Sequence, residues 1–165
     1  MTRILLLSDT HSHIDERMIK YMQQADEVWH AGDIGDSAVT DVIKELKPLR
    51  AVYGNIDDAT ARMEFPENDR FMCEGVDVWI THIGGYPDQY DRRIREKIKK
   101  DPPKLFICGH SHILKVIYDK ELGLLHMNPG AAGKHGFHKV RTMLQFVIDG
   151  NDIKNLEIIE LEQRI

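Results

Sequence analysis

The sequence is poor in cysteine. Its only two, Cys73 and Cys108, stand 35 positions apart. They form no Cys-x-x-Cys pair and therefore cannot supply a thiolate metal site. We expect two buried free thiols, as is usual for a protein of a reducing compartment.

Long apolar runs are also missing. The run from Ile4 to Leu7 is typical of the short ones. A membrane-spanning helix needs about 20 apolar residues, and the core of a signal peptide needs about 7–15. We therefore expect a cytoplasmic protein with no membrane segment.

A surplus of positive charge is absent too, because the formal net charge is −5. Binding to nucleic acid in bulk needs cations that neutralise phosphates, so this charge makes nucleic acid an unlikely partner. A small anionic substrate is still compatible with it, because such a substrate responds to the local field of its site.

What the chain does have is the composition of an ordinary globular protein. Its 165 residues are 42% hydrophobic and 30% charged, and no internal repeat or linker interrupts them. This length and composition predict one domain over residues 1–165.

The hydrophobic pattern predicts an α/β protein. Three short apolar strands alternate with two amphipathic helices, which favours a parallel sheet with right-handed crossovers. Two strands around Gly75, a helix, a buried strand and a strand-rich tail follow. The expected strands are 3–8, 27–31, 49–53, 70–74, 76–81, 105–108, 115–119, 124–127, 142–148 and 153–161. The expected helices are 15–24, one that follows caps at Asp36 and Ser37 and carries Val39 to Leu46, and 88–100. We expect two sheets packed face to face with the helices outside.

Polar turns follow five of the apolar strands. They are Asp9-x-His11, Gly32-Asp33, Gly54-Asn55, His82 and Gly109-His110-x-His112. Asp-x-His or Gly-Asp alone is more simply explained as a turn or a helix cap. Gly109-His110-x-His112 is a stronger signal, because two histidines two apart in an extended segment point the same way. Together, at the ends of successive strands, they predict side chains gathered at one edge of the sheets.

These turns offer two aspartates, one asparagine and four histidines, with no sulfur. Such a set suits Mn²⁺, Fe, Ni²⁺ or Zn²⁺. If Asp33 bridges two ions, seven residues supply eight ligand bonds, and a bridging hydroxide makes each ion five-coordinate. Two divalent ions, two carboxylates and hydroxide sum to a charge near +1. The pattern therefore predicts a two-metal site for a small phosphate ester.

The ordered motifs resemble those of the calcineurin-like metallophosphoesterases. The resemblance covers Asp9 to His112 and the tail to about Leu161. The small size of the chain and its Asn128-Pro129-Gly130 segment, a turn by composition, resemble the YfcE-type phosphodiesterase subfamily. It implies a four-layer α/β/β/α sandwich of two mixed sheets. It also implies two divalent metal ions, with manganese first and nickel, iron, zinc or magnesium as alternatives.

The resemblance also implies a division of the ligands between the ions. One ion would be held by Asp9, His11, Asp33 and His112, and the other by Asp33, Asn55, His82 and His110. Within this set we take Asp33, Asn55, His82 and His110 as the catalytic group.

One position departs from the wider family, whose members often read Gly-Asn-His-Glu. Here Ile56 follows Asn55, and an isoleucine cannot transfer a proton to the leaving group. Loss of a general acid costs about 10²–10⁴ in rate, which predicts modest turnover and a preference for good leaving groups. His13, His135 and His138 are alternative proton donors.

We therefore predict a phosphodiesterase in which a bridging hydroxide attacks phosphorus. Two alternatives stay open: a phosphomonoesterase, and a non-catalytic protein-binding scaffold of the same fold. Edge strands near the C-terminus also allow a homo-oligomer.

Three polar residues near these motifs have simpler interpretations. His30 and His126 lie in apolar strands and are expected to pack there or to support ligands. Asp57 is expected either to accept from the far nitrogen of a histidine ligand or to close its turn.

Overall fold

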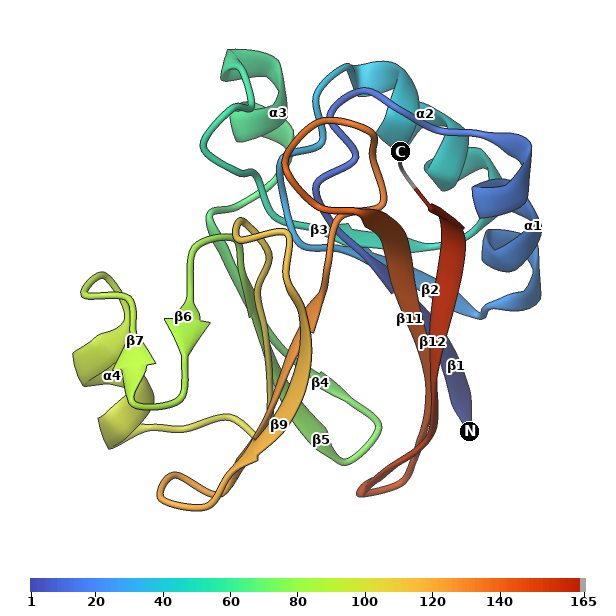
Figure 1. Ribbon diagram of the computed structural model, residues 1–165. Coiled ribbons are helices and arrows are strands. Elements are labelled where there is room, and N and C mark those ends of the chain that lie inside the picture. Colours follow the sequence, from blue (N-terminus) through green and yellow to red (C-terminus); the bar gives the residue numbers. More distant parts are fainter. Residues whose placement is uncertain (164–165) are drawn as a thin grey trace.

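Two five-stranded sheets dominate the computed structural model, which describes residues 1–163 (Figure 1). The first sheet has the order β12-β11-β1-β2-β3, and the second has the order β4-β5-β8-β10-β9. The strands of the first sheet are β1 (Thr2–Leu7), β2 (Glu27–His30), β3 (Leu49–Ala51), β11 (Val140–Asp149) and β12 (Asp152–Gln163). Those of the second are β4 (Asn68–Cys73), β5 (Val76–Thr81), β8 (Leu105–Ile107), β9 (Leu114–Asp119) and β10 (Leu124–Pro129).

Parallel pairing joins the strands that precede the polar turns and includes β10, which precedes none of them. β1, β2 and β3 are parallel neighbours, connected through α1 (Glu16–Gln24) and α2 (Ser37–Leu46). β5, β8 and β10 are likewise parallel, whereas β4, β9, β11 and β12 join antiparallel. Both sheets are therefore mixed, as predicted.

Successive side chains of a strand point to opposite faces of its sheet, so one apolar strand contributes to two cores. On β1, Ile4 and Leu6 enter the core between the sheets, while Leu5 and Leu7 pack under the helices. Such alternation is the geometry of a strand, whose successive side chains point to opposite faces. A strand buried on both faces reads as the continuous apolar run seen in the sequence.

The outer faces are covered by helices. α1 and α2 cover the first sheet, with Met18, Met22, Val39 and Ile43 buried there. On the second sheet, Ile98 of α4 (Arg95–Lys100) is buried in one cluster with residues of β5 and β8. The predicted α/β/β/α sandwich is confirmed. Both cysteines are buried free thiols, as expected.

Three local predictions were wrong. The helix expected over 88–100 spans only α4, because residues 85–90 form a small hairpin of β6 (Gly85–Tyr86) and β7 (Gln89–Tyr90). Tyr90 draws this segment onto the second sheet by donating to Asp119 Oδ2 at 2.6 Å. The short helix α3 (Ala59–Glu64) was not predicted. The turn expected at 128–130 begins only at Gly130, because β10 continues through Pro129, whose carbonyl accepts from Thr142 Oγ1.

No helix within the described residues 1–163 has the length and apolar character needed to cross a membrane.

Candidate metal centre

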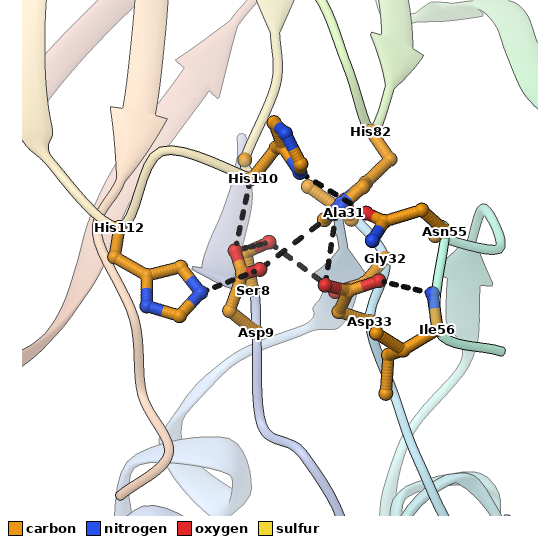
Figure 2. Close-up of polar contacts among 12 residues, drawn as sticks. Ser8, Asp9, Ala31, Gly32, Asp33, Asn55, Ile56, His82, His110 and His112 are labelled. Atoms are coloured by element: carbon orange, nitrogen blue, oxygen red, sulfur yellow. Dashed lines mark hydrogen bonds and ion pairs between the residues drawn. The ribbon is translucent and has the colours of Figure 1, made fainter. Parts of the chain in front are cut away.

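The carboxyl ends of the parallel strands meet at one edge of the two sheets. Asp9 and His11 follow β1, Asp33 follows β2, and Asn55 follows β3. His82 follows β5, and His110 and His112 follow β8. Figure 2 shows that side chains from all five turns converge there, as the sequence predicted.

Six of the seven residues form two clusters with metal-ligand spacing. One contains Asp9, His11 and His112, and the other contains Asp33, His82 and His110. Within each cluster the ligand atoms lie within 4.8 Å of one another. The six residues fall into the two groups that the resemblance implied, but Asp33 belongs to the second cluster only and Asn55 to neither. Each cluster takes residues from both sheets.

Asp33 belongs to the second cluster and also contacts a histidine of the first. Its Oδ2 is 3.3 Å from His82 Nε2 and 3.4 Å from His11 Nε2, while its Oδ1 accepts from the Ile56 amide. Burial alone would raise the pKa of this carboxyl. His82, the Ile56 amide and His11 outweigh burial and lower the pKa to about 2. Asp33 is therefore a carboxylate placed where it can contact both clusters.

Asp9 divides its oxygens in a similar way. Oδ2 accepts from Ser8 Oγ at 2.6 Å and from the His110 amide at 3.1 Å. Oδ1 has no hydrogen-bond partner among the described residues, although it is buried, and it lies 3.2 Å from His112 Nε2.

Backbone and side-chain acceptors fix which histidine nitrogens carry protons. A carbonyl only accepts, so the 2.7 Å contact to Ala31 O makes His82 Nδ1 the donor. By the same reasoning, His110 Nδ1 donates to Asn55 Oδ1 at 3.0 Å. The Nε2 lone pairs of both rings are thereby left for a cation, as in many metal sites.

His112 is oriented through a second histidine. His138 Nε2 donates to Gly133 O at 2.8 Å, so His138 Nδ1 accepts from His112 Nδ1, 3.3 Å away. The hydrogen bonds from His112 to His138 and from His138 to Gly133 thus orient the His112 ring with Nε2 toward Asp9.

The buried atoms without hydrogen bonds indicate what kind of ligand this centre can bind. Asp9 Oδ1, His11 Nε2 and His82 Nε2 are buried without a hydrogen bond among the described residues, a state that costs about 1–3 kcal/mol per group. Two ligands held about 2.1 Å from one ion, at angles near 90–110°, lie roughly 3.0–3.4 Å apart. The closest His–Asp separations, 3.2–3.4 Å, match this spacing. The donor set therefore fits divalent metal ions.

The backbone at the centre is strained. Asp9, His11, Asp33, His110 and His112 all have φ between 44° and 71°. Residues other than glycine rarely adopt this left-handed backbone conformation, and those that do cluster at functional sites.

Two glycines in the motifs allow close approach. A Cβ on Gly54 would lie 2.1 Å from Asp33 Oδ1, and one on Gly109 would lie 2.7 Å from Asp9 Oδ2. The glycines of Gly-Asn and Gly-His are therefore required by packing against the two carboxylates.

Asn55 stands beside the second cluster through its hydrogen bond to His110. Its role as a metal ligand stays a prediction.

Asp57, His30 and His126 are buried and make hydrogen bonds or contacts to the backbone around the site. Asp57 closes its turn, because its carboxylate accepts from the amides of Ile34, Gly35 and Gly54 at 2.8–3.1 Å. Burial lowers the pKa of His30 to about 4, and this neutral ring accepts from the Gly32 amide. His126 is buried and contacts Gly85 O.

The three alternative proton donors occupy different places. His13 Nε2 donates to Asp15, outside the cleft lining, and His138 supports His112. His135 stacks on His11, with ring centroids 4.7 Å apart, and lines the cleft beside the centre. Of the three, His135 best fits proton donation.

Two clefts flank the centre, and Asn55 lines both. One, of about 390 Å³, is lined by His82 and by polar side chains that include Arg62 and Arg93. The other, of about 500 Å³, is lined by candidate ligands and by Ile56, Ile113 and Phe137. Sequence analysis did not identify Arg62, Ile113, Phe137 or Ser8 as parts of the site, although a serine directly before Asp9 was a usable signal.

Comparison with known proteins adds a family and a fold. The model of the calcineurin-like phosphoesterase superfamily domain matches residues 2–151. A probable metallophosphoesterase of Mycoplasma pneumoniae is 29% identical over an alignment of 137 residues, and the alignment covers 79% of each chain.

Two solved structures share the fold. One is an archaeal phosphodiesterase (TM-score 0.75, 19% identity, 96% of this chain and 99% of that chain). The other is Vps29 of Entamoeba histolytica complexed with Zn²⁺ (TM-score 0.73, 16% identity, 97% and 99%).

Proposed function

We propose that this chain, which belongs to the calcineurin-like phosphoesterase superfamily, is a metal-dependent phosphodiesterase with a dinuclear centre. The observation that carries the proposal is the pair of clusters around Asp33, with three buried ligand atoms lacking hydrogen bonds. Manganese is our first choice of metal, and nickel, iron, zinc and magnesium are alternatives. A small phosphate ester is the proposed substrate.

The two clefts favour a diester over a monoester. A diester carries two substituents on phosphorus, and a phosphate held at the centre would lie beside two clefts that share Asn55 in their linings. The absence of a histidine after Asn55 points the same way, because Ile56 offers no proton to a poor leaving group. A phosphomonoesterase is the second enzymatic alternative.

The ions, when bound, supply a nucleophile from water near neutral pH and stabilise the charge on the phosphoryl oxygens. The residues of the chain prepare their site. Asp33 and Asp9 each keep one oxygen directed at histidine nitrogens, and His82 and His110 present Nε2 lone pairs. His135, over His11, is placed to protonate a departing group.

The principal rival is a protein-binding scaffold that uses the same fold. A scaffold has no need for buried ligand atoms without partners or for five strained residues at one site, because both features cost stability. Their presence favours catalysis.

A metal add-back experiment with Asp33→Asn tests the proposal. The protein is stripped of metal and given Mn²⁺, Ni²⁺, Mg²⁺ or Zn²⁺ singly, and hydrolysis of bis-p-nitrophenyl phosphate is compared with that of p-nitrophenyl phosphate. We expect metal-dependent cleavage that is faster for the diester. Asp33→Asn removes the negative charge between the clusters and should lower this rate by at least about 10²-fold.

Asp36→Asn is the matched control, because Asp36 only caps α2 and asparagine caps equally well. Absence of turnover with every metal, in a folded protein that binds two ions, would favour the scaffold.

A further inference from the structure

The wall of one cleft is unusually apolar for an exposed surface. Ile56 and Ile113 are 47% and 59% exposed, and the ring of Phe137 is fully exposed. They come from three separate segments, yet all three line the cleft that contains His11 and Asp33. Exposed apolar residues scattered singly are ordinary, but a group of them around a polar site marks a contact with a ligand.

The segment that carries Phe137 is fixed against the candidate metal centre. The Gly133 amide donates to Asp9 O at 3.1 Å, and His138 Nε2 donates to Gly133 O. Between them, Gly136 lies so close to His112 that an added Cβ would be 2.3 Å from its Nδ1. The backbone that carries Phe137 is therefore held next to a candidate metal ligand, while the ring itself is exposed.

The size of the cleft indicates what occupies it. About 500 Å³ is within the range of small-molecule sites, about 300–1,000 Å³, so it accommodates one substituent of a phosphate ester. The second cleft, which Asn55 also lines, is different in character, because Arg62, Arg93 and Asn68 line it. The two clefts therefore suit two different substituents.

We propose that Ile56, Ile113 and Phe137 form a binding site for an aromatic substituent of the phosphodiester. The ring stacks on Phe137 and packs against the two isoleucines while the phosphate is held at the metal centre. The polar substituent then occupies the cleft with the two arginines. This inference rests on the proposed function and narrows it to asymmetric diesters with one aromatic group.

Equilibrium binding of phosphonates tests the site without turnover. Dissociation constants of phenylphosphonate and methylphosphonate are measured calorimetrically with the Mn²⁺-loaded protein. Both ligands carry one substituent, and they differ only in the ring. We expect phenylphosphonate to bind about tenfold more tightly. Phe137→Ala should reduce this ratio about three- to tenfold, because stacking on the ring is lost, and Phe137→Tyr should retain it.

A matched pair of isoleucine variants provides the control. Ile113→Ala should also reduce the ratio, whereas Ile158→Ala, at a residue 54% exposed on β12 and outside the cleft lining, should leave it unchanged. Equal affinity for the two phosphonates, or a ratio that Phe137→Ala and Ile113→Ala leave unaltered, would overturn the inference. Binding of neither phosphonate would do the same.

Failure of the proposed function has a separate signature. It would appear as absent hydrolysis of bis-p-nitrophenyl phosphate with every metal, whatever the ratio of the phosphonate affinities.

Discussion

At the scale of single residues, the candidate centre repeats one device. Each aspartate gives one oxygen to hydrogen bonds and directs the other at histidine Nε2 atoms. Each carboxylate is thereby fixed in orientation while one oxygen stays available to a cation. His82 and His112 use the same division, with Nδ1 engaged by Ala31 O and by His138.

The His112–His138 contact leads to a prediction about metal affinity. His138→Ala removes the group that accepts from His112 Nδ1, so His112 is no longer held with Nε2 toward Asp9. Loss of such an orienting partner typically costs 10–100-fold in metal affinity. We expect calorimetric titration with Mn²⁺ to show one of two sites weakened about tenfold or more.

His138→Gln is the matched variant, because its side-chain oxygen can still accept from His112. We expect it to recover part of the affinity. Two undiminished sites in His138→Ala would show that His112 needs no such support.

At the scale of elements, Asp15 connects α1 to β11. It caps the helix by accepting from the Met18 amide at 3.0 Å, and it accepts from Arg141 of β11 at 2.9 Å. Arg141 is itself buried and donates to Ala132 O. The start of α1 is thus tied to the segment that leads to the Phe137 loop.

This connection predicts a pH dependence of stability. Burial alone would raise the pKa of Asp15, but the Met18 amide, His13 and Arg141 lower it from 3.8 to about 2. The folded pKa is below the unfolded one, so the charged form stabilises the fold above about pH 4. That contribution is lost as the pH falls from about 4 to 2.

Asp15→Asn keeps the helix cap and removes the charge. We expect its free energy of unfolding in urea to be about 1–2 kcal/mol lower than that of the native protein at pH 6. The difference should shrink steadily between pH 4 and pH 2.5, because Asp15 becomes protonated over this range. The other carboxylates are common to both proteins, so their titration cancels in the difference. A difference that is independent of pH would show that the ion pair contributes nothing.

The elements also show what a sequence pattern can and cannot predict. The buried parallel strands were predictable because strands covered on both faces are continuously apolar, and the turns between them carry the polar residues. The hairpin at residues 85–90 was not, since Tyr90 is held by Asp119, far away along the chain. α3 has six residues, too few for a helical period to be recognised.

The site was predicted more completely than its surroundings. Strand ends and glycine-flanked turns mark Asp9, Asp33 and the histidines as candidate ligands. Phe137 carries no such mark, because nothing in a sequence separates an aromatic residue that lines a cleft from one that packs in a core.

At the scale of the whole molecule, the centre lies across the two sheets. Asp9, His11 and Asp33 belong to turns of the first sheet, and His82, His110 and His112 belong to turns of the second. Without cations, the unpartnered atoms and the strained backbone of this edge oppose folding. Association into a homo-oligomer through an edge strand such as β12 stays a prediction.

Metal binding should therefore stabilise the whole fold. A ligand at 100 times its dissociation constant stabilises the folded state by about 2.7 kcal/mol, and each bound ion contributes separately. For a chain of this length, we expect Mn²⁺ to raise the melting temperature by roughly 5–15 °C. The measurement is a calorimetric scan of stripped and reloaded protein.

The same scan on Asp33→Asn should show a much smaller rise, whereas Asp36→Asn should behave as the native protein does. An unchanged melting temperature on addition of Mn²⁺ would contradict the assignment of a metal centre.

Both clusters take ligands from both sheets, so each bound ion would act as a cross-link in a protein whose two cysteines are free thiols. Separation of the two sheets at the ligand edge would then require the ions to leave. Amides near that edge would exchange with solvent more slowly in the metal-loaded protein than in the stripped one, while the apolar core between the sheets holds both forms together. The supply of metal would therefore affect how long the folded chain survives proteolysis.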